Sequence, residues 1–534
     1  MRKGIGRREF LKGMGGAGAA AAMGWLRPGG AGAVPGVFRW ASGSEARALD
    51  PARAITTGDS LARCWANGLL RFKPGSGDPS DFELDLAEKW DSSNGGKTFT
   101  FQLRKGVQAH HGAGELTSAD VKWTFERLRD KRLTSIFAGR YTGIDGIETP
   151  DRYTVRFHLK EPDGLFLTKM MNFRGGYILS RGKAADDVAT NYMWRPIGTG
   201  PFQVVATKPK EAYILERHEK YFRGTPKIRR YEYLIIADIN TRILGLKRGE
   251  LDAIYLATLP KRLLDSLKAD PNINVDVPDS DYAASLHFNL RMKPMDDIRV
   301  RQAIAYAINR KEIVDLFAPM ARPLYSVVSP SAVGGLKLED IPAGLRYEHN
   351  PGKAKALLAE AGHKSGLRLE TAVSPLPHIQ RPIQVIQQHL AQVGIQLKVN
   401  VVEQTIYLRG SRQDKYPLVS YGGKRFPHAY DHLFEWYHSK SDVNLPTRQT
   451  NISHYGSLVG NVDKLIEEIG RISDTKRQIE LAKQAQLQIL KDLPAYPFYT
   501  PLVGFAHRKN VKFGFKFEDQ TVYQYVLDER SEVL

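Results

Sequence analysis

Apolar residues recur with two different periods along this chain, and the two periods follow one another in its best-defined segment, residues 86–128. From 98 to 103 apolar and polar side chains alternate, which is the two-residue period of a half-buried strand. Asn94, Gly95 and Gly96 precede this strand and tolerate the positive φ angles of a tight turn. After a Thr-Ser-Ala-Asp segment with capping-box spacing, apolar residues return at helical spacing. The pattern predicts a strand followed by a helix.

Strand and helix patterns continue to alternate through the rest of the chain. We expect strands at residues 153–159 and 230–236 and helices at 299–310, 351–362 and 462–493, the last as one helix or two. This alternation is typical of α/β proteins. At 534 residues the chain is too long for a single core, which predicts two or three lobes.

Composition and charge narrow the class of protein. Hydrophobic residues make up 42% and charged residues 25% of the chain, as in an ordinary globular protein. The one cysteine, Cys64, excludes an intramolecular disulfide framework and a cysteine-based metal cage, and we interpret it as a small core residue. The formal net charge of +19 would suit nucleic acid, an anionic membrane or an acidic ligand. Because the basic residues are scattered, we interpret them as a solvated surface.

The first 33 residues have the features of an export signal. Arg7 and Arg8 precede a stretch of small and apolar residues, and an A-x-A cleavage motif ends at Ala33. We predict a twin-arginine signal peptide and a periplasmic protein, which argues against nucleic acid as a partner; an uncleaved amphipathic anchor is the alternative. A G-x-G-x-x-G sequence at 13–18 lies inside this signal with no strand before it, so we do not interpret it as a dinucleotide site.

Six segments, in chain order, have the form of motifs that occur together in one protein family. They are residues 49–51 (LDP), 86–121 (LAEKW, KTFTFQLRKGV and ADV), 198–202 (GTGPF), 246–252 (LKRGELD), 297–310 (DIRVRQAIAYAINR) and 353–362 (KAKALLAEAG). The chain thereby resembles family 5 of the extracellular solute-binding proteins, which deliver peptides, nickel or opine-like solutes to ABC importers. The resemblance covers nearly all of residues 45–530.

This resemblance implies an α/β protein with two hinged lobes, of the class II (cluster C) periplasmic-binding-protein type, with an extra subdomain. We expect the first lobe at residues 36–75, 196–284 and 500–534, the extra subdomain at 76–195 and the second lobe at 285–499. A small solute or peptide would be enclosed between the lobes and handed to an ABC permease in the inner membrane. The expected protein is a monomer without catalytic activity and without a cofactor.

The segment expected to line the solute site departs from the peptide-binding members of the family. Those members place an acidic residue just after a glycine, where it pairs with the amino terminus of the peptide. Here Lys424, Arg425 and Phe426 follow two glycines, so an ammonium group would face like charge. We therefore expect an anionic or carboxylate-rich solute or a modified peptide, with Arg425 holding a carboxylate. The alternative is an ion pair between Arg425 and a neighbouring acid such as Asp431.

The residues that follow supply aromatic and histidine candidates. Tyr430 and Trp436 are candidates to line an apolar pocket, although core packing is the ordinary role of such a tryptophan. Nickel-binding members of the family use a histidine in this loop, so His432 is the candidate if a chelated metal is bound. His428, His432 and His438 are spaced by four and six residues and do not by themselves form a metal site of fixed geometry.

Earlier in the chain, Trp65 and Asn67 lie where a helix of the first lobe is expected to face the cleft, and we interpret His110-His111 as part of a turn. The candidate ligand-binding residues are therefore Lys424, Arg425, Phe426, Tyr430, Asp431, His432, Trp436, Trp65 and Asn67.

Other functions remain open at this point. Within the family, the alternatives are a nickel or chelated-metal solute and an opine or sugar conjugate. Outside it, an exported hydrolase is the rival, but the sequence contains no G-x-S-x-G, H-E-x-x-H or P-loop motif. A sensor that partners a membrane receptor would share all the features of an importer component.

Overall fold

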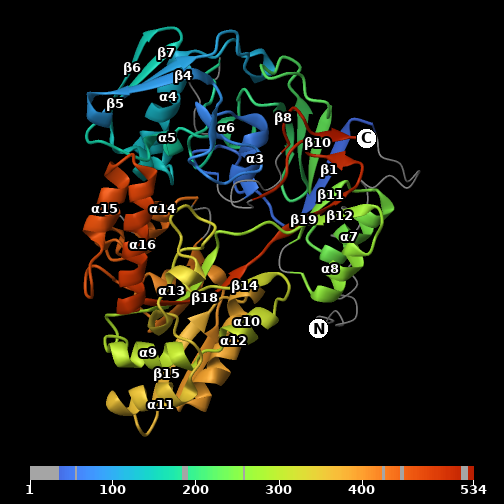
Figure 1. Ribbon diagram of the computed structural model, residues 1–534. Helices are drawn as coiled ribbons and strands as arrows, with labels where there is room; N and C mark the ends of the chain where they lie inside the picture. Colours follow the sequence, from blue (N-terminus) through green and yellow to red (C-terminus); the bar gives the residue numbers. More distant parts are fainter. Residues whose placement is uncertain are drawn as a thin grey trace, which may run out of the picture.

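The computed structural model describes residues 35–54, 57–182, 191–256, 259–423, 427–445, 450–518 and 527–534. The expected signal peptide and the candidates Lys424, Arg425 and Phe426 lie outside these ranges. Two lobes are visible in Figure 1, with a further subdomain beside the first lobe. Within the described ranges, none of the helices combines the length and apolar character that crossing a bilayer requires.

The first lobe is built on a mixed sheet of seven strands. Their order is β12 (Ile273–Asp276), β19 (Gly504–Arg508), β11 (Ala253–Leu256), β1 (Val37–Ser42), β10 (Arg230–Ile235), β9 (Ala212–Arg217) and β8 (Phe202–Lys208). The central strand β1 runs parallel to both of its neighbours, β10 and β11. Helices α3 (Thr57–Trp65), α7 (Ile239–Arg248) and α8 (Lys261–Lys268) accompany this sheet. Its core is aromatic, with Trp40 packed edge-on against Phe505.

The accessory subdomain is a four-stranded antiparallel sheet with a helix against it. The strand order is β4 (Ala87–Ser93), β5 (Thr98–Leu103), β7 (Thr154–Leu159) and β6 (Ile144–Asp151), and the helix is α4 (Ser118–Arg129). The strand predicted from alternation and the helix predicted from the capping-box spacing are confirmed as β5 and α4. The backbone N–H of Thr117 donates to Asp120 Oδ2 at 2.8 Å, as in a capping box. The pair β2 (Leu70–Phe72) and β3 (Phe82–Leu84) and the short helices α5 (Phe166–Lys169) and α6 (Asn191–Trp194) complete this half of the molecule.

The second lobe contains two sheets and most of the helices. The larger sheet has the order β14 (Ala321–Pro323), β18 (Ala495–Pro501), β13 (Ala283–Phe288) and β17 (Leu418–Gly423), and the smaller is the parallel pair β15 (Leu367–Val373) and β16 (Ile395–Val401). The helices are α9 (Ile298–Ala307), α10 (Arg310–Asp315), α11 (Pro351–Glu360), α12 (Pro377–Gln392), α13 (Gln404–Ser411), α14 (Ala429–Tyr437), α15 (Asp463–Arg471) and α16 (Thr475–Asp492).

One predicted helix differs from the structure. The segment expected as a single helix over 299–310 is interrupted, because α9 ends at Ala307 and Ile308 is extended. The side chain of Asn309 then accepts a hydrogen bond from Lys311 N and caps α10. The apolar spacing continues across this break, which is why periodicity alone predicts one helix. The segment 462–493 is two helices, α15 and α16.

The chain passes between the lobes at two places. It leaves the first-lobe sheet at β12 and enters the second-lobe sheet at β13, and it returns from β18 to β19. β18 ends at Pro501 and β19 begins at Gly504, so only residues 502–503 separate the two sheets there. The division of the chain proposed from sequence, with boundaries near 284 and 500, stays a prediction.

Candidate functional site

The described candidate residues after β17 lie on one short helix at the junction between the second lobe and the accessory subdomain. Helix α14 begins where His428 Nδ1 accepts the backbone N–H of Tyr430 at 3.0 Å. Tyr430, Asp431, His432 and Trp436 all belong to this helix. Asp431 therefore lies one helical turn from Glu435, and His432 one turn from Trp436.

Asp431 is paired with a residue that the sequence did not suggest. Arg140 Nη1, in the short 3-10 helix Ala138–Tyr141 of the accessory subdomain, lies 2.8 Å from Asp431 Oδ1. Burial alone would raise the pKa of the Asp431 carboxyl, but the positive charges of Arg140 and Arg174 outweigh it and lower that pKa. The alternative expected from sequence, an ion pair between Asp431 and Arg425, involves a residue outside the described ranges.

A second arginine, Arg174, in the segment after α5, belongs to the same junction. Its backbone has a φ of 46°, in the left-handed region, and its backbone N–H donates to Asp59 Oδ1 at 3.3 Å. Burial lowers the pKa of its guanidinium below the ordinary value, although the charges of Glu435 and Asp431 act in the opposite direction. The junction thus places two arginines from the first lobe's side opposite two carboxylates on α14.

Glu435 completes the described part of this charge cluster. Burial raises the pKa of its carboxyl, which Arg174 and a hydrogen bond from Thr450 partly oppose. Thr450 Oγ1 donates to Glu435 Oε1 at 3.0 Å. Because burial makes the Glu435 carboxylate costly to ionise, a cationic group of a solute beside it would stabilise its charged form.

His432 and Trp436 pack into the second lobe beneath the charged face of α14. The Trp436 ring is stacked on His287 of β13, with the centroids 4.8 Å apart, and on His432, with the centroids 5.9 Å apart. Burial lowers the pKa of His287 and of His432 to about 3, so both rings are neutral near pH 7. Among the described residues, no group of three or more His, Cys, Asp or Glu is arranged to hold a metal ion.

His438 and Tyr430, like His428 at the start of α14, make contacts that support the local fold. His438 caps the next short turn by accepting the backbone N–H of Lys440 at 3.0 Å, and Asp463 and Glu467 lie nearby. Tyr430 packs in a parallel arrangement with Phe434 on the same helix.

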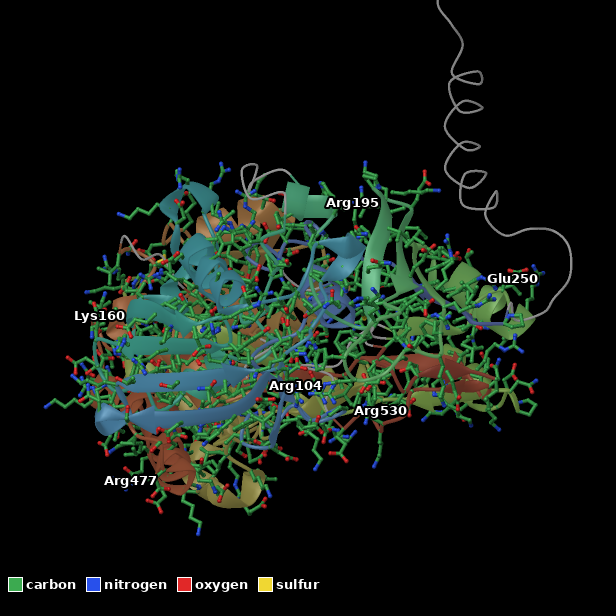
Figure 2. The ribbon with its side chains drawn as sticks, turned by 90° about the horizontal axis from the view of Figure 1, so that it is seen from above. Arg104, Lys160, Arg195, Glu250, Arg477 and Arg530 are labelled. Atoms are coloured by element: carbon green, nitrogen blue, oxygen red, sulfur yellow. The ribbon has the colours of Figure 1, made fainter. Side chains whose placement is uncertain are left out.

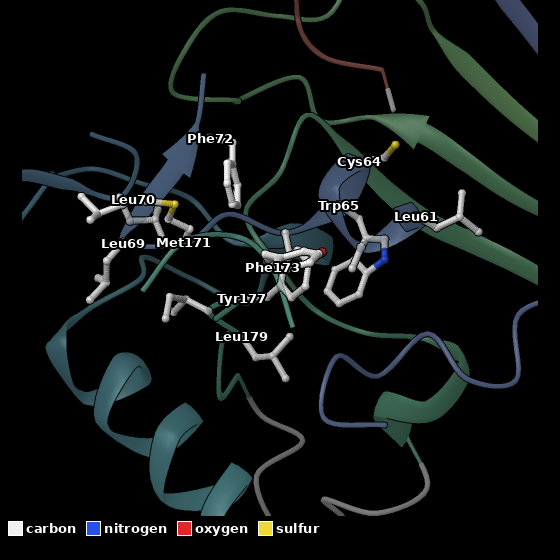
Figure 3. Packing of buried hydrophobic residues seen from close by; sticks show 14 of the residues in the cluster. Leu61, Cys64, Trp65, Leu69, Leu70, Phe72, Met171, Phe173, Tyr177 and Leu179 are labelled. Atoms are coloured by element: carbon white, nitrogen blue, oxygen red, sulfur yellow. The ribbon is translucent and has the colours of Figure 1, made fainter. Parts of the chain in front are cut away.

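Trp65 is the last residue of α3 and packs inside the first lobe (Figure 3), and Asn67, two residues later, is buried as well. Asn67 is 3% exposed, and its amide nitrogen donates to both carboxylate oxygens of Asp85 at 3.0 Å. Its amide oxygen accepts from Thr199 Oγ1 at 3.0 Å. These bonds fix Asn67 within the lobe, and its expected contact with a solute stays a prediction.

Sequence reasoning missed Arg140, Arg174 and Glu435. Arg140 and Arg174 stand in segments without a periodic pattern, more than 250 positions from α14. A signal for Arg174 is the pair of glycines that follows it, since Gly175 also has a positive φ, of 92°, and marks an irregular backbone. Glu435 is four residues after Asp431, so the helical repeat of α14 is the pattern that points to it.

Comparison with known proteins shows to which family the chain belongs. The profile described as bacterial extracellular solute-binding proteins, family 5 Middle, matches residues 81–444. The dipeptide-binding protein of Escherichia coli K12 is 28% identical over 483 residues, covering 86% of this chain and 87% of the relative. The di/tripeptide-binding protein 1 of Pseudomonas aeruginosa UCBPP-PA14 is 30% identical over 499 residues, covering 87% of this chain and 88% of the relative.

A solved structure extends the comparison to the fold. MoaA from A. tumefaciens R10, in complex with mannopinic acid, superposes with a TM-score of 0.81 at 32% identity, covering 94% of this chain and 100% of that protein. The α/β fold of two lobes and the family expected from the six motifs are confirmed. The family is one of binding proteins, and its members capture solutes for ABC importers. The chain therefore belongs to the bacterial extracellular solute-binding proteins, family 5.

Proposed function

We propose that this solute-binding protein captures a carboxylate-bearing peptide or peptide-like acid at the junction of the accessory subdomain and α14. The carboxylate is held by Arg174, and a cationic group of the solute, where present, by Glu435. Arg425 and Lys424, which follow β17 directly in the sequence, supply further positive charge. The solute is delivered to an ABC permease of the inner membrane by a monomeric protein.

The observation that carries this proposal is the environment of Arg174. The charges of Glu435, Asp431 and Asp59 favour its charged state, yet burial still lowers the pKa of the guanidinium. A further anion beside it would therefore be stabilised, and a guanidinium binds a carboxylate through two parallel hydrogen bonds. Its left-handed φ of 46° is a strained conformation for a residue with a side chain, of the kind found at ligand sites.

Relatives support a solute of this class. The two curated relatives are named for dipeptides and for di- and tripeptides, and MoaA was solved with mannopinic acid. A glutathione-binding protein of Salmonella typhi is also 28% identical, over 502 residues. An opine-type acid is therefore a second candidate beside a peptide.

Calorimetry on the exported protein tests the carboxylate. The panel is the dipeptide Met-Leu, glutathione and mannopinic acid, each compared with its carboxyl-amidated form, after mass spectrometry of any solute that co-purifies. We expect at least one acid to bind, its amide to bind at least ten-fold more weakly, and Arg174→Gln to remove that difference. Arg156→Gln, which alters an exposed pair with Glu148 in the same subdomain, is the matched control. Equal affinity for acid and amide would overturn the proposal.

The proposed export route is tested separately. Arg7→Lys together with Arg8→Lys keeps the charge but changes the twin-arginine pair. We expect the double variant to accumulate in the cytoplasm with residues 1–33 uncleaved, whereas the parent is recovered from the periplasm. Unimpaired export of the double variant would contradict the twin-arginine assignment without affecting the assignment of the solute.

A further inference from the structure

The accessory subdomain and the second lobe contact one another through two charged side chains, Arg140 and Asp431. Arg140 Nη1 and Asp431 Oδ1 are 2.8 Å apart, although 291 positions separate them in the sequence. Both side chains are largely buried, with exposed fractions of 17% and 16%. In Figure 1 α5 of the subdomain lies next to α14, the helix that carries Asp431, and next to α15 of the second lobe.

A backbone contact lies on the same side of the junction. The N–H of Gly164, between β7 and α5, donates to the carbonyl oxygen of Gly470 in α15 at 2.9 Å. A Cβ atom on Gly164 would come within 1.6 Å of the carbonyl oxygen of Ile472. Because no real Cβ approaches a backbone oxygen so closely, any side chain at position 164 would force the two surfaces apart.

We propose that these two contacts form a lobe latch: the Arg140–Asp431 ion pair and the Gly164–Gly470 hydrogen bond hold the lobes closed. Asp431, a candidate ligand residue by sequence, is then a positioning residue that acts through Arg140. The inference rests on the two-lobed capture of a solute and is independent of which solute is captured.

The physical basis is a difference between the open and closed states. When the lobes separate, the Arg140–Asp431 ion pair breaks and both side chains become hydrated. The pair therefore stabilises only the closed state. Besides Arg140, both Arg174 and Lys169 place positive charge near Asp431, which keeps the carboxylate ionised and favours the pair. An affinity gained through closure applies equally to every solute that binds the closed state.

The latch is tested by measuring closure directly, with no solute added. Spin labels at Lys160→Cys and Lys476→Cys report the distance between the subdomain and α16; Figure 2 shows Lys160 and the neighbouring Arg477 on the two parts. Both labelled positions are exposed, whereas the native Cys64 is buried. In this labelled protein, Arg140→Gln and Asp431→Asn should each raise the population at the open distance, relative to the population at the closed distance, by about ten-fold.

The double variant separates a direct pair from two independent effects. If the side chains act through one another, Arg140→Gln with Asp431→Asn should open the protein no further than either change alone. Asp431→Glu should restore part of the closed population, and Arg156→Gln should leave the distances unchanged. Gly164→Ala should open the lobes by an independent, steric route.

Each remaining outcome contradicts the latch. Additive opening by the two substitutions, or unchanged distances in both single variants, would show that the pair does not hold the lobes. Weaker binding of Met-Leu by Asp431→Asn than by Arg140→Gln, with unchanged distances, would place Asp431 in the solute site instead. The distance measurements do not depend on the carboxylate proposal, because they are made without solute. That proposal has its own test in the amidated solutes.

Discussion

Arg127, in the last turn of α4, is hydrogen-bonded to Asp50, the central residue of the LDP motif near the start of the first lobe. The distance from Arg127 Nη1 to Asp50 Oδ1 is 3.1 Å, and the side chains are 4% and 0% exposed. Asp50 Oδ1 also accepts the backbone N–H of Ala52 at 3.0 Å. The LDP motif is thus joined by a buried ion pair to the helix that begins at the ADV motif, which fastens the accessory subdomain to the first lobe.

Breaking this pair should destabilise the protein strongly. Asp50→Asn leaves the Arg127 guanidinium buried without its counter-charge, and we expect the free energy of unfolding to fall by about 3–5 kcal/mol. Urea unfolding followed by far-UV circular dichroism measures the change. Asp130→Asn, which alters a pair with the exposed Arg132, is the control and should have no measurable effect. A small loss from Asp50→Asn would mean that the pair contributes little to the attachment.

The glycines of the GTGPF segment should be required for packing. A Cβ on Gly200 would lie 2.5 Å from the carbonyl carbon of Trp65 and 2.7 Å from Ala66 N. Gly200→Ala should therefore lower the free energy of unfolding by about 1–3 kcal/mol, because backbone cannot move aside cheaply. Gly146→Ala is the matched control, since its Cβ would meet nothing within 4 Å. Equal stability of the two variants would contradict this role for the motif.

A buried histidine in the second lobe should lose stabilising power as the pH rises. His454 Nδ1 lies 2.9 Å from Asp442 Oδ1, and its Nε2 lies 2.7 Å from Asp414 Oδ1. Burial would lower the pKa of His454, but the two carboxylates outweigh it and raise that pKa. The contribution is therefore complete below the unfolded pKa of about 6.5 and is lost as the pH rises through the folded pKa.

The test is urea unfolding between pH 6 and 9. His454→Gln should flatten the decrease in the free energy of unfolding over this interval, by at most about 1.4 kcal/mol per pH unit. The exposed His349→Gln is the control. An unchanged slope in His454→Gln would show that the imidazole is not held in its protonated form.

His110 should have the opposite pH dependence. Its Nε2 lies 2.9 Å from the carbonyl oxygen of Gly200, and its Nδ1 lies 3.4 Å from the Gly198 N–H, an arrangement that a neutral ring satisfies. Burial lowers its pKa to about 3. Because the unfolded chain takes up a proton below about pH 6.5 and the folded chain does not, this histidine reduces stability as the pH falls from 6.5 towards 3.

Unfolding between pH 4 and 7 checks this sign. His110→Gln should reduce the acid-induced loss of stability per pH unit, even though it lowers stability at pH 7 by disturbing the turn. The same His349→Gln protein is the control. If the acid slope of His110→Gln equals that of the parent, the ring is protonated in the folded state.

Elements with a clear local period could be predicted from the sequence. The strand β5 and the helix α4 lie where alternation and the capping box placed them, because these signals depend only on neighbouring residues. The break between α9 and α10 was missed, since the apolar spacing continues through Asn309 while the backbone does not. The family was also predicted correctly, from motifs whose glycines and charged residues meet specific packing needs.

By itself, the sequence determined the alternation of strands and helices, the family and the segment that leads into α14. Only the tertiary structure decided which charges meet: Arg140 with Asp431, and Arg174 with the face that carries Glu435. The physical reason is that a periodic pattern records which side of an element is buried, whereas an ion pair between distant segments leaves no periodic trace. Such a pair exists only in the folded chain, where segments far apart in the sequence lie side by side.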